Sequence, residues 1–235
     1  MADMEHARLA QGDRLAEIEY EKGLWAMASM LQIPGLALAC AASLAAVKGS
    51  NRVEAERSIP CTNLDLAIRE VGRPPTQYVE FCQTRPEECA MSGEAKIDWT
   101  REVREKVSNA NTYVNKNCIL MPDLEWQGEE DVWGLPFHGR GDCEDFALGK
   151  RRRLSQGGIP RAALRLAIGI HATQYISHVV LLIDTNEGTY TLDNESTELK
   201  CWSATEYYFE GRERLDGLWD WYDQAYWKLG HSPRR

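Results

Sequence analysis

The part of the sequence best suited to chemistry is the block Gly-Asp-Cys-Glu-Asp-Phe at residues 141–146. Its cysteine, Cys143, is followed along the chain by His178 and Asp193. A cysteine, a histidine and a carboxylate can together form an activated nucleophile, in which the imidazole takes the thiol proton and the carboxylate orients the imidazole. We therefore predict that these three residues form a catalytic triad.

Cys143 is expected at the start of a helix over residues 142–154. With Asp142 as the N-cap, the thiol lies in the first turn, where the unpaired N–H groups and the helix dipole favour the thiolate. The carboxylates of Asp142 and Glu144 oppose this effect unless a bound cation neutralises them. A single cysteine is most often a buried structural thiol, but the glycine-rich approach at residues 139–141 favours an exposed turn.

The two other members of the triad are expected on a β-hairpin formed by residues 177–183 and 189–192. If the turn is centred on residues 186–187, Asp184 faces Thr189. His178 then lies diagonally opposite Asp193 on the same face, where the carboxylate can fix the tautomer of the ring. A one-residue bulge would put the two side chains on opposite faces. His138, in the loop before Cys143, is a second candidate for the base.

The remaining elements predict an α+β fold in which the helix that carries the nucleophile packs on an antiparallel sheet. Residues 98–114 have one apolar face at helical spacing, with Asp98 as the expected N-cap. Residues 63–70 have a short helical pattern, and 164–170 are typical of a strand. Residues 202–209 are either another strand or an aromatic-rich turn.

Composition and charge narrow the class of partner. The chain has 235 residues and a net charge of -9, which disfavours nucleic acid because binding to phosphates needs a basic field. The only dense basic run is at residues 151–153, and we expect it on a solvated helix face.

The N-terminal residues 1–58 look like an extension that precedes a catalytic domain over residues 59–235. The apolar segment 31–47 resembles the core of a signal peptide, although the residues before it are acidic rather than basic. It could instead form an amphipathic or buried helix. Export would place the protein in the periplasm without a stable membrane span after processing; otherwise the protein is cytoplasmic.

The seven cysteines contain no Cys-x-x-Cys pair, which argues against a structural zinc site of ordinary spacing. Cys82 and Cys89 are close enough in sequence to close a short disulfide in an oxidising compartment. The alternative is a pair of buried thiols.

The pattern as a whole resembles the bacterial transglutaminase-like cysteine proteinase family over about residues 72–222. The matching segments are Pro74-Pro75, Phe81-Cys82, Cys89-Ala90, Val114-Asn115, Pro122-Asp123, Asp131-Val132-Trp133, the block at 141–147, Lys150-Arg151, Gly158-Ile159-Pro160, His178-Val179-Val180-Leu181 and Leu192-Asp193-Asn194. The resemblance implies a papain-like, transglutaminase-like fold and the triad of Cys143, His178 and Asp193.

The same resemblance implies calcium close to the nucleophile, because the best-known members of the family are calcium-dependent periplasmic proteases of the LapG type. The implied ligands are Asp142 and Glu144, with Asp145 as a third. Hard oxygen ligands suit Ca²⁺, although these acids could also simply cap the helix. The implied partners are a protein substrate, such as a cell-surface adhesin, and a regulatory membrane protein.

The expected reaction is cleavage of a peptide bond through a thioester on Cys143. Two alternatives stay open. The same thioester can be attacked by an amine, which gives transglutaminase or deamidase chemistry on glutamine side chains. The chain could also be a binding module with an inactive site.

Overall fold

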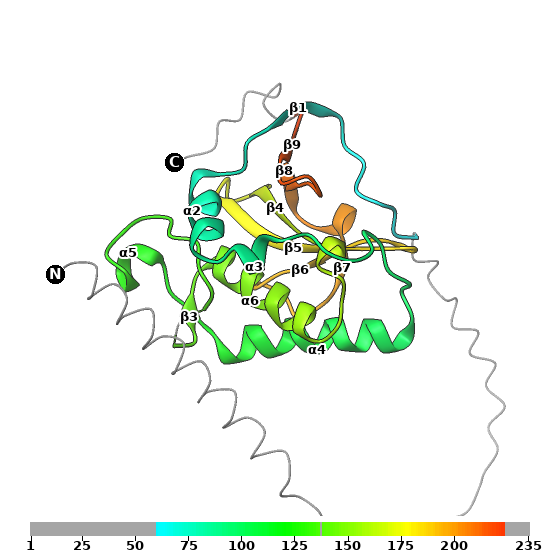
Figure 1. Cartoon of the computed structure of the whole chain (residues 1–235), viewed down its shortest axis with the longest axis horizontal. Coiled ribbons are helices and arrows are strands. Elements are labelled where there is room, and N and C mark those ends of the chain that lie inside the picture. Colours follow the sequence, from blue (N-terminus) through cyan, green and yellow to red (C-terminus); the bar gives the residue numbers. More distant parts are fainter. Residues whose placement is uncertain (1–59, 137, 224–235) are drawn as a thin grey trace, which may run out of the picture. The chain divides into compact units, whose positions relative to one another are not determined.

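The computed structural model describes residues 60–136 and 138–223 (Figure 1). The predicted extension over residues 1–58, with its apolar segment 31–47, lies outside the described residues, as do residues 224–235 of the predicted domain. In the described part, a seven-stranded antiparallel sheet has the order β1-β9-β8-β4-β5-β6-β7. Its strands are β1 (Ile68–Gly72), β4 (Leu164–His171), β5 (Ser177–Thr185), β6 (Gly188–Leu192), β7 (Lys200–Cys201), β8 (Tyr207–Glu213) and β9 (Trp219–Tyr222).

Helices are concentrated in the first half of the described chain. They are α2 (Thr76–Thr84), α3 (Pro86–Cys89), α4 (Arg101–Asn117), α5 (Asp123–Trp126) and α6 (Cys143–Gln156), with short 3-10 turns at Arg161–Ala163 and Trp202–Ala204. Two short strands pair in parallel: β2 (Ile119–Leu120), which follows α4, and β3 (Arg140–Gly141), which precedes α6. The predicted α+β class is therefore confirmed.

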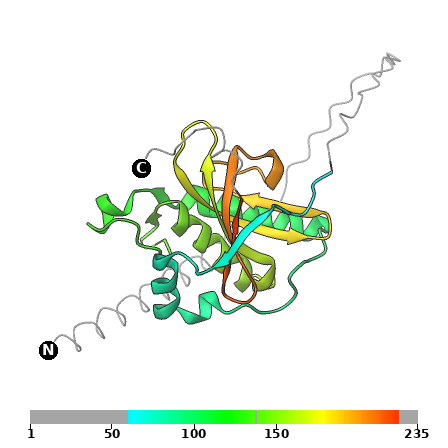
Figure 2. The same cartoon turned by 90° about the horizontal axis from the view of Figure 1, so that it is seen from above.

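The helices form layers on one face of the sheet. Helix α6 packs against β5, and α4 packs against α6, as Figures 1 and 2 show from two directions. Side chains along β5 alternate between the two faces of the sheet, so the strand contributes to a hydrophobic core on each face. Val179, Leu181 and Ile183 join the core beneath the helices, whereas Val180 and Leu182 join a smaller core on the other face.

The hairpin register is the one that the sequence predicts. Asp184 faces Thr189, and the ladder between β5 and β6 runs to Leu181 opposite Leu192. Asp193 is therefore the first residue beyond the end of β6, and the start of β5 extends past its partner strand.

Two predictions about local structure are wrong. Residues 63–70 form no helix; the chain is extended there and ends in strand β1, which pairs with β9. Leu64 and Leu66 both contact the smaller core, a spacing of two that fits an extended chain better than a helix. Helix α4 begins after Thr100, whose Oγ1 accepts the Val103 N–H at 3.2 Å, so Asp98 is not its N-cap.

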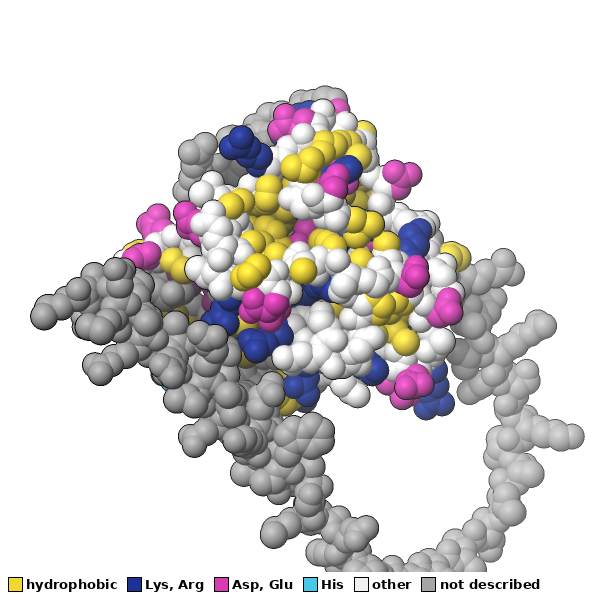
Figure 3. All heavy atoms as spheres, in the orientation of Figure 1, with side chains coloured by type: hydrophobic (Ala, Val, Ile, Leu, Met, Phe, Trp, Pro, Cys, Tyr) yellow, Lys and Arg dark blue, Asp and Glu magenta, His cyan; other side chains and the backbone are white. Residues whose placement is uncertain are grey.

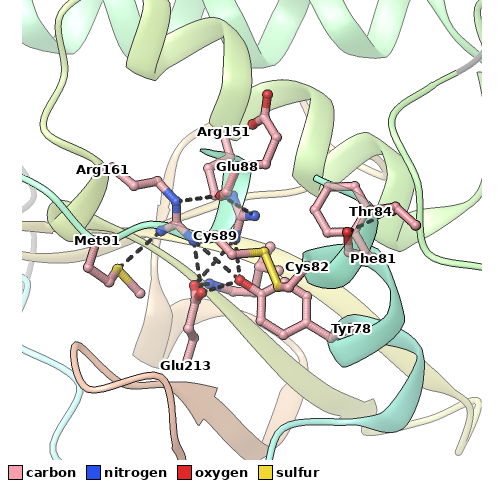
Figure 4. The surroundings of a disulfide bond; sticks show 11 residues. Tyr78, Phe81, Cys82, Thr84, Glu88, Cys89, Met91, Arg151, Arg161 and Glu213 are labelled. Atoms are coloured by element: carbon pink, nitrogen blue, oxygen red, sulfur yellow. Dashed lines mark hydrogen bonds and ion pairs between the residues drawn. A yellow bond between two sulfur atoms is a disulfide. The ribbon is translucent and has the colours of Figure 1, made fainter. Parts of the chain in front are cut away.

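Arg151 is fully buried, contrary to the prediction of a solvated basic run. Arg151 forms an ion pair with a buried acid, Glu213 at the end of β8 (Figure 4). Glu213 also forms an ion pair with Arg161 at 2.8 Å and accepts a hydrogen bond from the Tyr78 hydroxyl. The two guanidiniums hold the pKa of Glu213 below its ordinary value although burial opposes this. This cluster joins α2, α6, β8 and the 3-10 turn at Arg161–Ala163.

Among residues 60–136 and 138–223, two disulfides are formed. One joins Cys82 to Cys89 and closes the α2–α3 segment, which settles the choice between a bridge and two thiols (Figure 4). The other joins Cys61 to Cys201 across a sequence separation of 140 residues. The sequence offered no spacing signal for the second pair, because its partners are far apart along the chain.

The surface includes exposed apolar side chains on the edge strand β1, where Ile68 is 50% and Val71 47% exposed. In the face drawn in Figure 3, hydrophobic side chains gather around the position that β1 has in Figure 1. None of the helices formed by residues 60–136 and 138–223 is long and apolar enough to cross a membrane.

Candidate active site

Cys143 is the first residue of helix α6, and Asp142 occupies the N-cap position as predicted. The Asp142 side chain makes no capping hydrogen bond, however. The approach to the helix is crowded: a Cβ built on Gly141 would lie 2.2 Å from Asp145 Oδ2, so only glycine fits there. The half-buried thiol is thus presented at the helix N-terminus, next to the start of β5.

His178 and Asp193 are in direct contact. The His178 Nε2 lies 2.9 Å from Asp193 Oδ1, and both side chains are buried. Asp193 Oδ1 also accepts the Glu195 N–H at 3.0 Å, and Asp193 Oδ2 accepts the Tyr207 hydroxyl at 2.6 Å. Burial alone would raise the pKa of Asp193, but the hydrogen bond and charge of His178 and the Tyr207 hydroxyl hold it at about 2.

Helix α4 holds the loop that carries Asp193. The Asn115 side-chain amide donates to the Asp193 carbonyl at 2.8 Å and to the Ser196 carbonyl at 3.1 Å. Asn111, one turn earlier, donates to the same Ser196 carbonyl at 2.9 Å. Two asparagines on one helix face therefore fix the backbone at Asp193 and at Ser196, three residues further along the loop.

The thiol lies beside His178 without bonding to its ring. The Cys143 Sγ accepts the N–H of Val179, the residue after His178, at 3.4 Å, and it donates to Glu144 Oε2 at 3.1 Å. Val179 lies beyond the last β5–β6 pair, where the neighbouring strand has ended. Among the described residues the sulfur makes no hydrogen bond to His178.

The charge around the sulfur opposes ionisation. Burial and the neighbouring Glu144 carboxylate raise the pKa of the Cys143 thiol well above its ordinary value. The helix N-terminus was expected to lower this pKa, but burial of the thiol and then the charges of Glu144 and Asp142 outweigh that effect. Burial and the nearby Asp142 carboxylate in turn raise the pKa of Glu144 to about 9.

Three carboxylates gather next to the nucleophile. Asp123, Asp142 and Asp145 each offer an oxygen within 4.8 Å of the others. Asp145 accepts the Gly134 N–H at 2.8 Å, and burial together with the Asp142 charge raises its pKa to about 7. Asp142 Oδ1 is buried with no hydrogen-bond partner in the described structure.

Sequence reasoning placed Asp142 and Asp145 in this group but did not single out Asp123. The sequence did contain a signal for Asp123, because Pro122-Asp123 is one of the segments that carry the family resemblance. Glu144, the third predicted ligand, lies outside the group and contacts the thiol. His138 lies edge-on to Trp126 with ring centroids 6.5 Å apart, and it is His178 that bonds Asp193.

Comparison with known proteins identifies the family to which the chain is similar. Residues 68–225 match the model of a family described as bacterial transglutaminase-like cysteine proteinase BTLCP. No curated protein matches the chain.

Three structures of LapG from Legionella pneumophila are similar to the chain. The calcium-bound form is 21% identical over 61% of this chain and 77% of its own, with a TM-score of 0.44. A second LapG structure is 22% identical over 66% and 82%, with a TM-score of 0.45. The EGTA-treated form is 23% identical over 61% and 75%, with a TM-score of 0.44. The family match covers most of the chain and includes the whole site described above, and the chain therefore belongs to the bacterial transglutaminase-like cysteine proteinases.

Proposed function

We propose that the chain is a cysteine endopeptidase with Cys143 as nucleophile, His178 as acid and base, and Asp193 as the group that orients His178. The observation that carries the proposal is the 2.9 Å contact between His178 and Asp193. The Cys143 sulfur lies beside this pair, because it accepts a hydrogen bond from the backbone N–H of Val179, the residue after His178. This arrangement matches the roles that a thiol protease needs.

The position of the proton on His178 follows from its partner. Asp193 has a pKa of about 2 and is ionised at neutral pH, so it can only accept a hydrogen bond. The Nε2 atom of His178 must therefore carry a proton, and Nδ1 is the ring atom left to exchange protons with the thiol and the substrate.

The reaction would proceed in two stages. Cys143 Sγ loses its proton to His178 Nδ1 and attacks the carbonyl carbon of the scissile bond; the C–N bond then breaks as His178 returns the proton to the leaving amine. Water next attacks the thioester, gives a proton to His178 and releases the acid and the thiol. The Cys143 N–H, which has no partner within the helix because it lies in the first turn of α6, is one donor available to the oxyanion.

Calcium fits the carboxylate group formed by Asp123, Asp142 and Asp145. Three hard oxygen donors, one of them a buried oxygen without a partner, are the kind of ligand that Ca²⁺ prefers. When bound, the ion supplies positive charge beside the helix N-terminus and so offsets the carboxylates that raise the thiol pKa. These aspartates would hold it, next to Glu144 and the thiol.

The compartment proposed is the periplasm. The pairs Cys61–Cys201 and Cys82–Cys89 support it, because stable disulfides form in oxidising compartments and are rare in the cytosol. The proposed substrate is a protein exposed at the cell surface. A regulatory membrane protein remains an expectation from the family resemblance.

The test is cleavage of the cell's own surface proteins by the purified chain. Wild type, Cys143→Ala and the control Cys118→Ala, which removes another free thiol, are each incubated with cells in calcium or in EGTA, and released fragments are identified by mass spectrometry. We expect new fragments with wild type and Cys118→Ala in calcium only. Cleavage by Cys143→Ala would refute the proposal. If a labelled amine is added to the same incubation, its incorporation into glutamine side chains would favour transglutaminase chemistry.

A further inference from the structure

Tyr207 touches both members of the His178–Asp193 pair. Its ring stacks on the His178 ring with centroids 5.1 Å apart and an interplanar angle of 19°. Its hydroxyl donates to Asp193 Oδ2 at 2.6 Å, whereas His178 uses Asp193 Oδ1. Each oxygen of the carboxylate therefore has its own side-chain donor, which prevents the carboxylate from rotating away from the imidazole.

A glycine makes this contact possible. Tyr207 is on β8 and His178 on β5, and strand β4 lies between them. Gly169 is the β4 residue that pairs with His178, and a Cβ placed on it would lie 3.0 Å from Tyr207 Cβ. The absence of a side chain at Gly169 is what lets the tyrosine ring cross β4 and reach the histidine.

A bulge in β8 selects which tyrosine faces the site. Ile168 pairs with Gly211, but the next residue, Gly169, pairs with Phe209, so β8 has one extra residue at this point. Side chains alternate between faces, and paired residues share a face. The extra residue therefore puts Tyr207 on the face of His178; with a regular ladder Tyr208 would take that face.

Tyr208, the next residue in the chain, is 44% exposed. The Tyr207 ring also contacts His171, whose ring lies edge-on to it at 5.6 Å and an angle of 82°. The ring of Tyr207 thus packs against both His171 and His178.

We propose that Tyr207 is a positioning residue for the catalytic pair, and that Gly169 and the β8 bulge exist to bring it there. This inference rests on the proposed function, because it assigns Tyr207 a role in the chemistry of that site. Tyr207 acts through His178 and Asp193 and takes no part in bond making. The ring fixes the plane of the imidazole, and the hydroxyl fixes the carboxylate that orients it.

The first test needs no substrate. In a Cys143→Ala background, the proton on His178 Nε2 is followed by NMR as a downfield signal in wild type, Tyr207→Phe, Gly169→Ala and Tyr190→Phe. Tyr190 is the matched control, because its ring stacks on Trp99 at 4.7 Å, away from the pair. We expect Tyr207→Phe and Gly169→Ala to shift or broaden the signal, and Tyr190→Phe to leave it unchanged. An unaltered signal in Tyr207→Phe would overturn the inference whether or not the chain is a protease.

The second test is kinetic and uses the substrate found by the cleavage experiment. Loss of one hydrogen bond to a charged group predicts that Tyr207→Phe lowers kcat about tenfold with KM within about twofold. In an Asp193→Ala background the same substitution should cause no further loss, because the tyrosine acts through the carboxylate. A full tenfold loss in that background would show that Tyr207 acts elsewhere.

Discussion

His178 Nε2 and Asp193 Oδ1 lie 2.9 Å apart although the chain makes a complete hairpin between them. The contact depends on the β5–β6 register, in which Asp184 faces Thr189 and the two side chains fall on one face. It also depends on the end of β6 at Leu192, which frees Asp193 to turn toward the imidazole. A change of one residue in the turn would separate the pair.

Asp193→Asn should lower kcat by about a hundredfold or more, because a neutral amide lacks the charge that stabilises the imidazolium, and its NH2 group can donate to the ring and so favour the other tautomer. The measurement is kcat for cleavage, with folding checked by circular dichroism. Glu198→Gln, an exposed acid in the same loop, is the matched control and should retain activity. Equal activity of wild type and Asp193→Asn would remove the carboxylate from the mechanism.

Calcium should stabilise the fold most strongly at high pH. Glu144 and Asp145 have pKa values of about 9 and about 7, above the ordinary carboxyl value, because burial and Asp142 favour their protonated forms. A group with a raised folded pKa stabilises the fold while protonated and loses that contribution as pH rises through the folded pKa. In EGTA the Tm should therefore fall as pH rises from about 5 to about 9.

Calcium at about a hundredfold excess over Kd adds about 2.7 kcal/mol, or roughly 5–10 °C in Tm for a chain of this size. Asp123→Asn should reduce this shift, whereas Glu125→Gln, exposed on the same helix α5, should not. Scanning calorimetry with and without calcium gives the answer. If calcium does not change the Tm at any pH, the carboxylate group of Asp123, Asp142 and Asp145 is excluded as the calcium site.

Removing the long-range disulfide should destabilise the fold without touching the active site. Cys61–Cys201 closes a loop of 140 residues, and loss of a native disulfide typically costs about 2–4 kcal/mol. The Cys61→Ser, Cys201→Ser double variant should show this loss in a urea titration, and Cys118→Ser should not. Peptide mapping without reductant should recover both cross-linked pairs from the native protein; recovery of free Cys61 and Cys201 would contradict the structure.

Glu213→Gln should be among the most destabilising single substitutions. It leaves Arg151 and Arg161 buried with uncompensated charge, which costs about 3–5 kcal/mol. Glu187→Gln breaks an ion pair with Arg104 in which both side chains are more than half exposed, and it should cost less than about 1 kcal/mol. Similar losses in the two variants would show that the buried cluster does not stabilise the fold.

The hairpin and the nucleophile helix were predictable because short-range rules decide them. The position of the turn at residues 186–187 determines the β5–β6 register, and the glycine-rich entry to Cys143 marks the start of α6. The buried state of Arg151 was not predictable, since it depends on Glu213, an acid from a distant strand. Three consecutive arginines look the same in sequence whether or not one has such a partner.

The parts of the site that the sequence did not reveal all require knowledge of the sheet order. Asn115 reaches the Asp193 loop from α4, and Tyr207 reaches Asp193 across β4. Strand β8 lies next to β4 rather than next to its sequence neighbour β7, a placement that no local pattern encodes. The β8 bulge then decides which of two adjacent tyrosines faces the histidine.

The rate at which iodoacetamide alkylates Cys143 at pH 7 tests the central claim most directly, with Cys118 as a reference thiol in the same chain. The thiolate reacts and the thiol does not, so the rate reports ionisation by the imidazole. We predict that in calcium Cys143 reacts at least about tenfold faster than Cys118, and that His178→Ala or EGTA abolishes the difference. Equal rates for the two thiols in calcium, or an undiminished Cys143 rate in His178→Ala, would contradict the account.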